Sequence, residues 1–140
     1  MTRRIVLLSW LVISIGCAGE SYEIAPVSGR VTVDGQPLGD CQIRFQPLRS
    51  SEGNINPGPG AFAVTDQDGR FTLRTINPVR PGAVVGKHRV WMTTVKEEDA
   101  TTELGLATAE RVPPRYRNGQ LDFEVQPEGT DQANFDLNTS

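Results

Sequence analysis

The stretch VSGRVTVDG, residues 27–35, decides the fold of this chain. Valine or glycine occupies every second position from Val27 to Val33, and serine, arginine and threonine stand between them. Because side chains alternate between the two faces of a β-strand, this pattern predicts a strand with one apolar and one polar face. The Asp34-Gly35 pair that follows is typical of a tight turn, since glycine adopts positive φ at no steric cost.

Other short segments repeat this alternation and are separated by turn residues. The most clearly marked hairpin joins a strand containing Phe62 and Val64 to one containing Phe71 and Leu73 through a turn at 66–69. The remaining strands are expected at 41–45, 87–95, 121–125 and 135–137. About seven short strands without a long helix predict an all-β, antiparallel β-sandwich.

Two segments between the expected strands are irregular. Residues 76–86 contain two prolines, which lack the N–H that a β-ladder needs, so we expect a connector that crosses from one sheet to the other. Residues 96–119 are polar and contain Pro113-Pro114. We expect a long surface loop there, with a helical turn near Glu97 to Glu103 as the one candidate helix.

The start of the chain has the three parts of an export signal. Arg3 and Arg4 precede an apolar run from Ile5 to Ile15, and small residues follow. At about 1.5 Å per residue, a helix of this length covers roughly half of a bilayer's hydrocarbon core, so the run is too short for a permanent span. We therefore expect residues 1–16 to be a signal peptide, 17–25 a linker and 26–138 the sandwich domain.

The residues before Cys17 resemble the lipobox of bacterial lipoproteins. In that family the cysteine is linked to diacylglycerol and begins the mature chain. Ile15 and Gly16 match the family pattern, whereas Ser14 stands where the family favours Leu, Val or Ile. The resemblance implies lipidation of Cys17 and export to the cell envelope as an outer-membrane lipoprotein. The departure at Ser14 leaves open cleavage before Gly19 and a soluble secreted or periplasmic protein.

The charge balance narrows the choice of partner. Removing residues 1–16 leaves 12 basic and 17 acidic residues, a net charge of −5. Such a balance argues against nucleic acid or an anionic lipid surface as the partner. The one membrane contact that we expect is through the lipid anchor.

Four segments together resemble the carboxypeptidase regulatory-like, or transthyretin-like, domain. These are residues 27–38, 43–45, 65–73 and 86–90, and the resemblance covers about residues 25–138. Pro113-Pro114-Arg115-Tyr116 resembles a segment of the small lipoprotein members of planctomycete bacteria. The resemblance implies a prealbumin-like or immunoglobulin-like sandwich that serves as a structural or binding module without established catalysis.

The residues that could carry chemistry each have a structural interpretation. His88, the only histidine, lies on the inward side of its expected strand, and we interpret it as a core histidine with satisfied hydrogen bonds. Cys41 has no CxxC or Cys/His spacing around it, which favours an inert buried thiol. Asp66 and Asp68 begin like a calcium loop, but Arg70 occupies the third acidic position, which favours a plain turn. We expect no catalytic residues, metal or cofactor.

Binding is therefore the expected function, and four side chains are candidates for ligand contact: Trp91, Arg115, Tyr116 and Arg117. We predict a non-catalytic, surface-anchored structural or interaction module whose partner is an envelope protein or polysaccharide. The alternative is a carbohydrate-binding accessory domain, which would need the rings of Trp91 and Tyr116 coplanar on one face. A secreted hydrolase would need His88 beside a nucleophile and an acid.

Overall fold

The computed structural model describes residues 22–49, 56–97 and 109–140. The predicted signal peptide, Cys17 and the part of the predicted helical turn beyond Glu97 lie outside these ranges. No helix within the ranges is long and apolar enough to cross a membrane.

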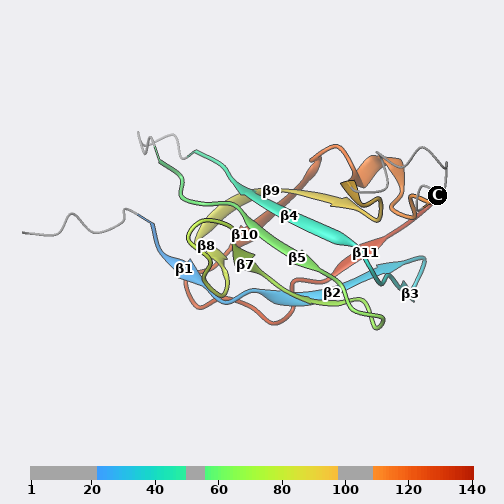
Figure 1. The fold of residues 1–140 in the computed structure, drawn as a ribbon, viewed down its shortest axis with the longest axis horizontal. Coiled ribbons are helices and arrows are strands. Elements are labelled where there is room, and N and C mark those ends of the chain that lie inside the picture. The colour runs from blue at the N-terminus through green and yellow to red at the C-terminus, as the bar shows by residue number, and fades with distance from the viewer. Residues whose placement is uncertain (1–21, 50–55, 98–108) are drawn as a thin grey trace, which may run out of the picture.

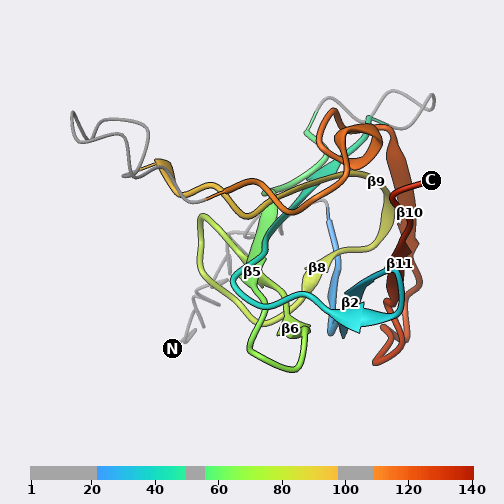
Figure 2. The ribbon, with the colours of Figure 1, turned by 90° about the vertical axis from the view of Figure 1, so that its right-hand side faces the viewer.

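The described residues form an all-β structure, as the alternating pattern predicts, with two main sheets facing each other (Figures 1 and 2). The five-stranded sheet is antiparallel and has the order β10 (Leu121–Val125), β9 (Gly86–Thr93), β4 (Gln42–Pro47), β5 (Ala61–Val64) and β7 (Arg74–Thr75). The four-stranded sheet contains β11 (Phe135–Leu137), β2 (Ser28–Val33), β3 (Gln36–Pro37) and β6 (Arg70–Thr72). A small third sheet pairs β1 (Ile24–Ala25) with β8 (Ala83–Val84).

Inward side chains of both sheets form one apolar core. The Phe45 ring of β4 lies at its centre, with its centroid 5.5 Å from that of Phe123 and 6.1 Å from that of Phe135. Phe71 of β6 stacks on Phe135 at 6.2 Å. Each such ring pair contributes about 0.5–1.5 kcal/mol beyond the burial of its area. Aromatic contacts therefore join the two sheets across the core.

The sheets are antiparallel, as predicted, apart from one pair of strands. β11 pairs with β2 in parallel, with Phe135 opposite Val31. The cause lies in the preceding turn, where the chain reverses at Gly129 with φ of 74°. Thr130 then accepts a hydrogen bond from the N–H of Ser28 and donates its own N–H to Pro26, both at 2.9 Å. The last segment consequently enters beside the start of β2 and runs in the same direction.

The predicted turn at 66–69 is present, but its two strands do not form a simple hairpin. The N–H of Gly69 donates to the carbonyl of Asp66, and the N–H of Asp66 donates to Arg70, both at 2.9 Å. After this turn, β6 pairs with β2 of the other sheet, and only β7 returns to pair with β5. The hairpin therefore divides between the two sheets after its turn.

The chain changes sheets at Leu73, between β6 and β7. The N–H of Leu73 donates to the carbonyl of Val27 at 2.9 Å, and its own carbonyl accepts from Gly82 at 2.8 Å. The predicted crossing within 76–86 is wrong, because this connector begins after β7 and ends at β9, both in the five-stranded sheet. The chain thus changes sheets within a segment, from Phe71 onward, that the alternating pattern predicts as one continuous strand.

Candidate functional site

His88 lies in the core, where it cannot meet a substrate. Its Nδ1 is 3.0 Å from the carbonyl oxygen of Gly86, so Nδ1 carries the proton and donates, since a carbonyl can only accept. The other ring nitrogen, Nε2, is buried and has no hydrogen-bond partner among the described residues. The expectation of a satisfied histidine therefore holds for one nitrogen only. Burial lowers the pKa of His88 despite the opposing bond to Gly86, and the ring is neutral at pH 7.

Cys41 is the inert buried thiol that the sequence predicts. The residue is fully buried and free. Burial, with a smaller contribution from the charge of Glu110, raises the pKa of the Cys41 thiol to about 12. Only the thiolate is a nucleophile or a metal ligand, so this side chain has neither activity at neutral pH.

Asp66 serves the turn that follows it. Its Oδ1 accepts the N–H groups of Asp68 and Arg70, both at 2.9 Å. These bonds are those of an Asx-type turn, in which a carboxylate replaces a backbone acceptor. Within residues 22–49, 56–97 and 109–140, no group of three or more His, Cys, Asp or Glu side chains is arranged to hold a metal ion.

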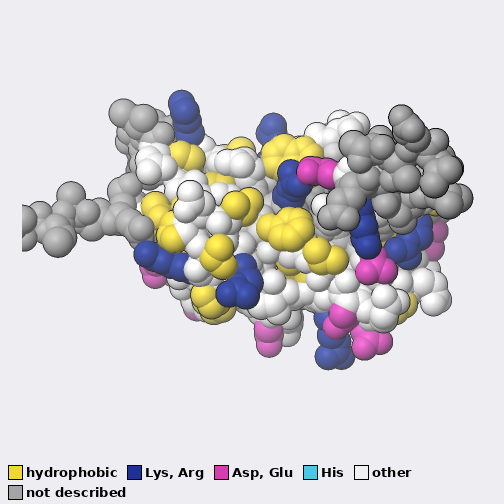
Figure 3. Space-filling view, viewed as in Figure 1, with side chains coloured by type: hydrophobic (Ala, Val, Ile, Leu, Met, Phe, Trp, Pro, Cys, Tyr) yellow, Lys and Arg dark blue, Asp and Glu magenta, His cyan; other side chains and the backbone are white. Residues whose placement is uncertain are grey.

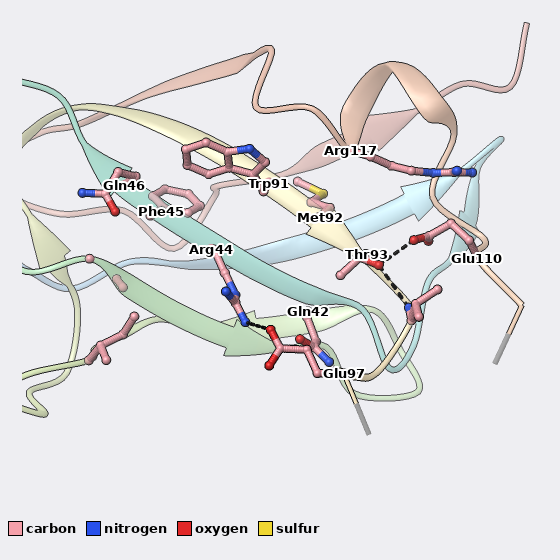
Figure 4. A pocket seen from close by; sticks show the side chains of 14 residues that line it. Gln42, Arg44, Phe45, Gln46, Trp91, Met92, Thr93, Glu97, Glu110 and Arg117 are labelled. Atoms are coloured by element: carbon pink, nitrogen blue, oxygen red, sulfur yellow. Dashed lines mark hydrogen bonds and ion pairs between the residues drawn. The ribbon is translucent and has the colours of Figure 1, made fainter. Parts of the chain in front are cut away.

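The four predicted ligand contacts separate into two places. Trp91 and Arg117 line one cavity of about 600 Å³ on the outer face of the five-stranded sheet (Figure 4). Arg115 and Tyr116 instead bind the end of the chain. The Tyr116 hydroxyl accepts the N–H of Asn138 at 3.3 Å, and the Arg115 guanidinium donates to the carbonyl of Ser140. Arg115 and Tyr116 are therefore not among the residues that line the cavity beside Trp91.

A row of alternating rings and arginines crosses the outer face of the five-stranded sheet. Trp91 of β9 lies opposite Arg44 of β4, Arg44 lies opposite Phe62 of β5, and Phe62 lies opposite Arg74 of β7. We call these four residues the outer row. Figure 3 shows apolar and basic side chains interleaved across this face. Because directly opposed residues on one sheet face lie about 4.5–5.5 Å apart at Cβ, the four side chains form one continuous surface.

Exposed aliphatic side chains extend this surface toward the edge of the sheet. Val64, Ile76 and Val79 are 49%, 57% and 63% exposed, and they are three of the four exposed large hydrophobic residues in the described ranges. With Phe62 and Arg74 they line a second hollow of about 800 Å³. Exposed apolar side chains gathered in one place make this face a candidate for an interaction site, whereas single exposed hydrophobic residues need no explanation.

Two carboxylates lie near the outer row, and neither neutralises it strongly. Glu97 is 2.9 Å from Arg44, but the two side chains are 83% and 55% exposed, so the pair contributes about 1 kcal/mol at most. Glu110 accepts hydrogen bonds from the hydroxyls of Thr93 and Thr94 and from the N–H of Val112. Burial alone would raise the pKa of Glu110, but these bonds outweigh it and hold the pKa below its usual value.

The indole of Trp91 is held in place from one side. Gly119 has φ of 64°, and a Cβ at this position would overlap the indole ring. Nearby, the Nε of Arg117 donates to the carbonyl of Val112 at 2.6 Å, which fixes the segment that carries Gly119. A ring that is already ordered loses little entropy when a ligand binds.

Sequence reasoning did not find the outer row as a site, although it placed Phe62 and Val64 in a strand. Both face outward because the inward positions of β5 hold Ala61 and Ala63, which lie opposite Phe45 and Ile43 of β4. In β5 the small residues therefore face the core and the large residues face outward. The available signal was this pair of alanines between larger residues.

Comparison of the chain with protein-family models, with curated proteins and with solved structures found no match. The resemblance to carboxypeptidase regulatory-like domains therefore stays a prediction from the residues that carry it.

Proposed function

We propose that this protein is a non-catalytic interaction module of the cell envelope, held at the membrane by lipid on Cys17. It binds its partner through the outer face of the five-stranded sheet. The observation that carries the proposal is the concentration of Val64, Ile76 and Val79 beside the outer row. Apolar side chains on this face add nothing to the core, which lies on the other side of the sheet, so a partner that covers them gives a reason for their presence.

The positions of the two candidate catalytic residues also support a binding role. His88 of β9 and Cys41, which directly precedes β4, are both fully buried in the core, away from the outer face. The resemblance to the carboxypeptidase regulatory-like domain agrees with this proposal, since it implies a binding or structural module.

A sedimentation assay tests the binding face. The purified full chain is mixed with delipidated cell envelopes of its own bacterium, and the bound fraction is measured. We expect Ile76→Ser/Val79→Ser to lose binding, because both side chains are exposed and removing them leaves the core intact. The control Arg30→Ala/Arg70→Ala changes exposed residues of the other sheet and should bind like the unchanged chain. Equal binding by both variants would refute the proposed face.

The anchor is tested by Cys17→Ser. We expect the substitution to abolish labelling with radioactive fatty acid and to move the protein from the membrane to the soluble fraction, because lipid chains supply the membrane affinity. Unchanged partitioning, or an intact mass that corresponds to an unmodified chain beginning at Gly19, would contradict the anchor.

A further inference from the structure

We propose that the partner is an acidic polysaccharide, which lies across β9, β4, β5 and β7 in contact with the outer row. This inference rests on the proposed function, because it names the partner of the same surface.

The spacing of the outer row fits a repeating polymer. Neighbouring strands lie about 4.8 Å apart, so Trp91 and Phe62, two strands apart, are separated by about 9.6 Å, as are Arg44 and Arg74. That distance is close to the length of a disaccharide in an extended glycan. The apolar C–H face of a sugar can stack on each ring, and an acidic group on the next sugar can pair with each guanidinium, which binds carboxylate or sulfate through two parallel hydrogen bonds.

The charge of the outer row is complementary to such a polymer. Arg74 has no ion pair among the described residues, and Arg44 has only the exposed pair with Glu97. A carboxylate or sulfate of the ligand can replace Glu97 at little cost, because Glu97 is 83% exposed and returns to water. The hydrogen bonds that Glu110 accepts satisfy its charge locally. Although the chain as a whole is acidic, this row thus presents cations to a polyanion.

The position of the row argues against a peptide strand and against a lipid surface. A peptide that extends a sheet binds the backbone of an edge strand, whereas β4 is paired on both sides, by β9 and by β5. A lipid surface would use the aliphatic residues Val64, Ile76 and Val79, but it gives no role to the regular alternation of rings and cations. The glycan accounts for both the alternation and its direction across the strands.

Trp91 allows the contact to be measured directly. The chain has two tryptophans, Trp10 and Trp91, so Trp91 is the sole tryptophan of the full chain that carries Trp10→Phe. Its fluorescence is titrated with polygalacturonate, alginate, hyaluronate and dextran sulfate, and with fully methyl-esterified polygalacturonate as the uncharged match. We expect at least one acidic polymer to quench the Trp91 fluorescence to saturation. Added salt should weaken the binding of this polymer, and an uncharged match should bind about tenfold more weakly.

Two arginines of one chain segment give a matched pair of variants. Arg74 belongs to the outer row, whereas Arg70 lies four positions earlier and is exposed on the other sheet. Arg74→Ala should weaken polymer binding about tenfold, and Arg70→Ala should leave it unchanged. Phe62→Ala should weaken binding to a similar extent through lost stacking.

The possible failures separate the two proposals. The inference is overturned if none of the acidic polymers binds, or if Arg70→Ala weakens binding as much as Arg74→Ala. It is also overturned if phosphatidylglycerol vesicles bind with the same dependence on Arg74 while the polymers do not. In these cases, envelope binding that still depends on Ile76 and Val79 would leave the proposed function standing. If the chain binds none of the acidic polymers and its envelope binding does not depend on Ile76 and Val79, both proposals are refuted.

Discussion

The outer faces of the two sheets differ, although the inner faces of both contribute to one apolar core. On the four-stranded sheet, outward positions hold polar side chains that form hydrogen bonds: the Thr32 hydroxyl donates to the Asp136 carboxylate, and the Arg30 Nε donates to the backbone carbonyl of Asp68, both at 2.8 Å. On the five-stranded sheet, outward positions hold the rings of Trp91 and Phe62. A solvated face of an antiparallel sheet is normally polar, so the four-stranded sheet shows what stability requires. The five-stranded sheet departs from that pattern, and the departure locates the candidate site.

The largest effect should come from the core side of the four-stranded sheet. Phe71 is only 4% exposed and stacks on Phe135. We expect Phe71→Ala to lower the free energy of unfolding by about 3 to 5 kcal/mol, through lost burial and the cavity left behind. Urea denaturation measures the change. If the free energy of unfolding fell by less than about 1 kcal/mol, the Phe71 ring would not be an important part of the core.

A smaller loss of stability is expected at Gly29, where the backbone of β2 lies close to the backbone of the last segment. A Cβ at Gly29 of β2 would overlap the backbone carbonyl of Ala133, whereas a Cβ at Gly60 would lie 3.2 Å from the nearest atom, the carbonyl oxygen of Phe45. We expect Gly29→Ala to cost about 1 to 3 kcal/mol, because overpacking forces the backbone to shift. Gly60→Ala beside the five-stranded sheet serves as the control and should cost less in the same denaturation experiment. The reverse order would contradict the close approach of β2 to the last segment.

Acid should destabilise the protein through His88, which lies on the core side of the five-stranded sheet. The folded pKa of His88 lies below the unfolded value of about 6.5, so the unfolded state binds the extra proton. Stability is therefore fully present above about pH 6.5 and falls, by at most about 1.4 kcal/mol per pH unit, as the pH drops toward the folded pKa. Thermal unfolding between pH 7 and pH 5 measures this loss.

The matched variant for this pH dependence is His88→Phe, which keeps an aromatic ring beside Phe45 but cannot titrate. Its melting temperature should change little over the same pH range. Glu110 acts in a separate window, because its lowered pKa makes its stabilisation disappear only as the pH falls below about 4.5. An unchanged pH profile in His88→Phe would show that another group causes the acid sensitivity.

The smallest change in stability should come from a substitution in the outer row, because its side chains lie outside the core that contains Phe71. Phe62 is half-buried and outward-facing, so Phe62→Ala should cost less than about 1 kcal/mol while weakening ligand binding. The same urea experiment compares the two variants. A cost as large as that of Phe71→Ala would mean that the outer rings serve stability, and it would remove the main support for the binding face.

Local alternation predicted the long strands, because burial of one face imposes a period of two on the sequence. It could not predict partners that lie far away in the chain. The parallel pairing of β11 and the move of β6 to the other sheet depend on the turn at Gly129 and on the bonds of Leu73. The two-residue strands β1, β3 and β8 were also missed, since two residues carry no periodic signal.

The candidate site was predictable only in part for a related reason. Trp91 was found because a tryptophan among outward positions is conspicuous in the sequence. The sequence did not reveal that Arg115 and Tyr116 hydrogen-bond to Ser140 and Asn138, because these partners are 25 and 22 positions away in the chain. Arg44 was missed because an arginine in an alternating strand is ordinarily a solvated residue, and only the register places it between two rings.

The parallel pairing of β2 and β11 also determines how the domain bears mechanical tension. The chain reaches the start of β2 from β1 and leaves the sheet at the end of β11, so a pull on the segments outside this pair draws the two neighbouring strands in opposite directions along their length (Figure 1). Their hydrogen bonds are then loaded in shear and must break together, whereas strands pulled from the same end would peel apart one bond at a time. Single-molecule stretching that opened this pair at very low force would contradict the shear geometry.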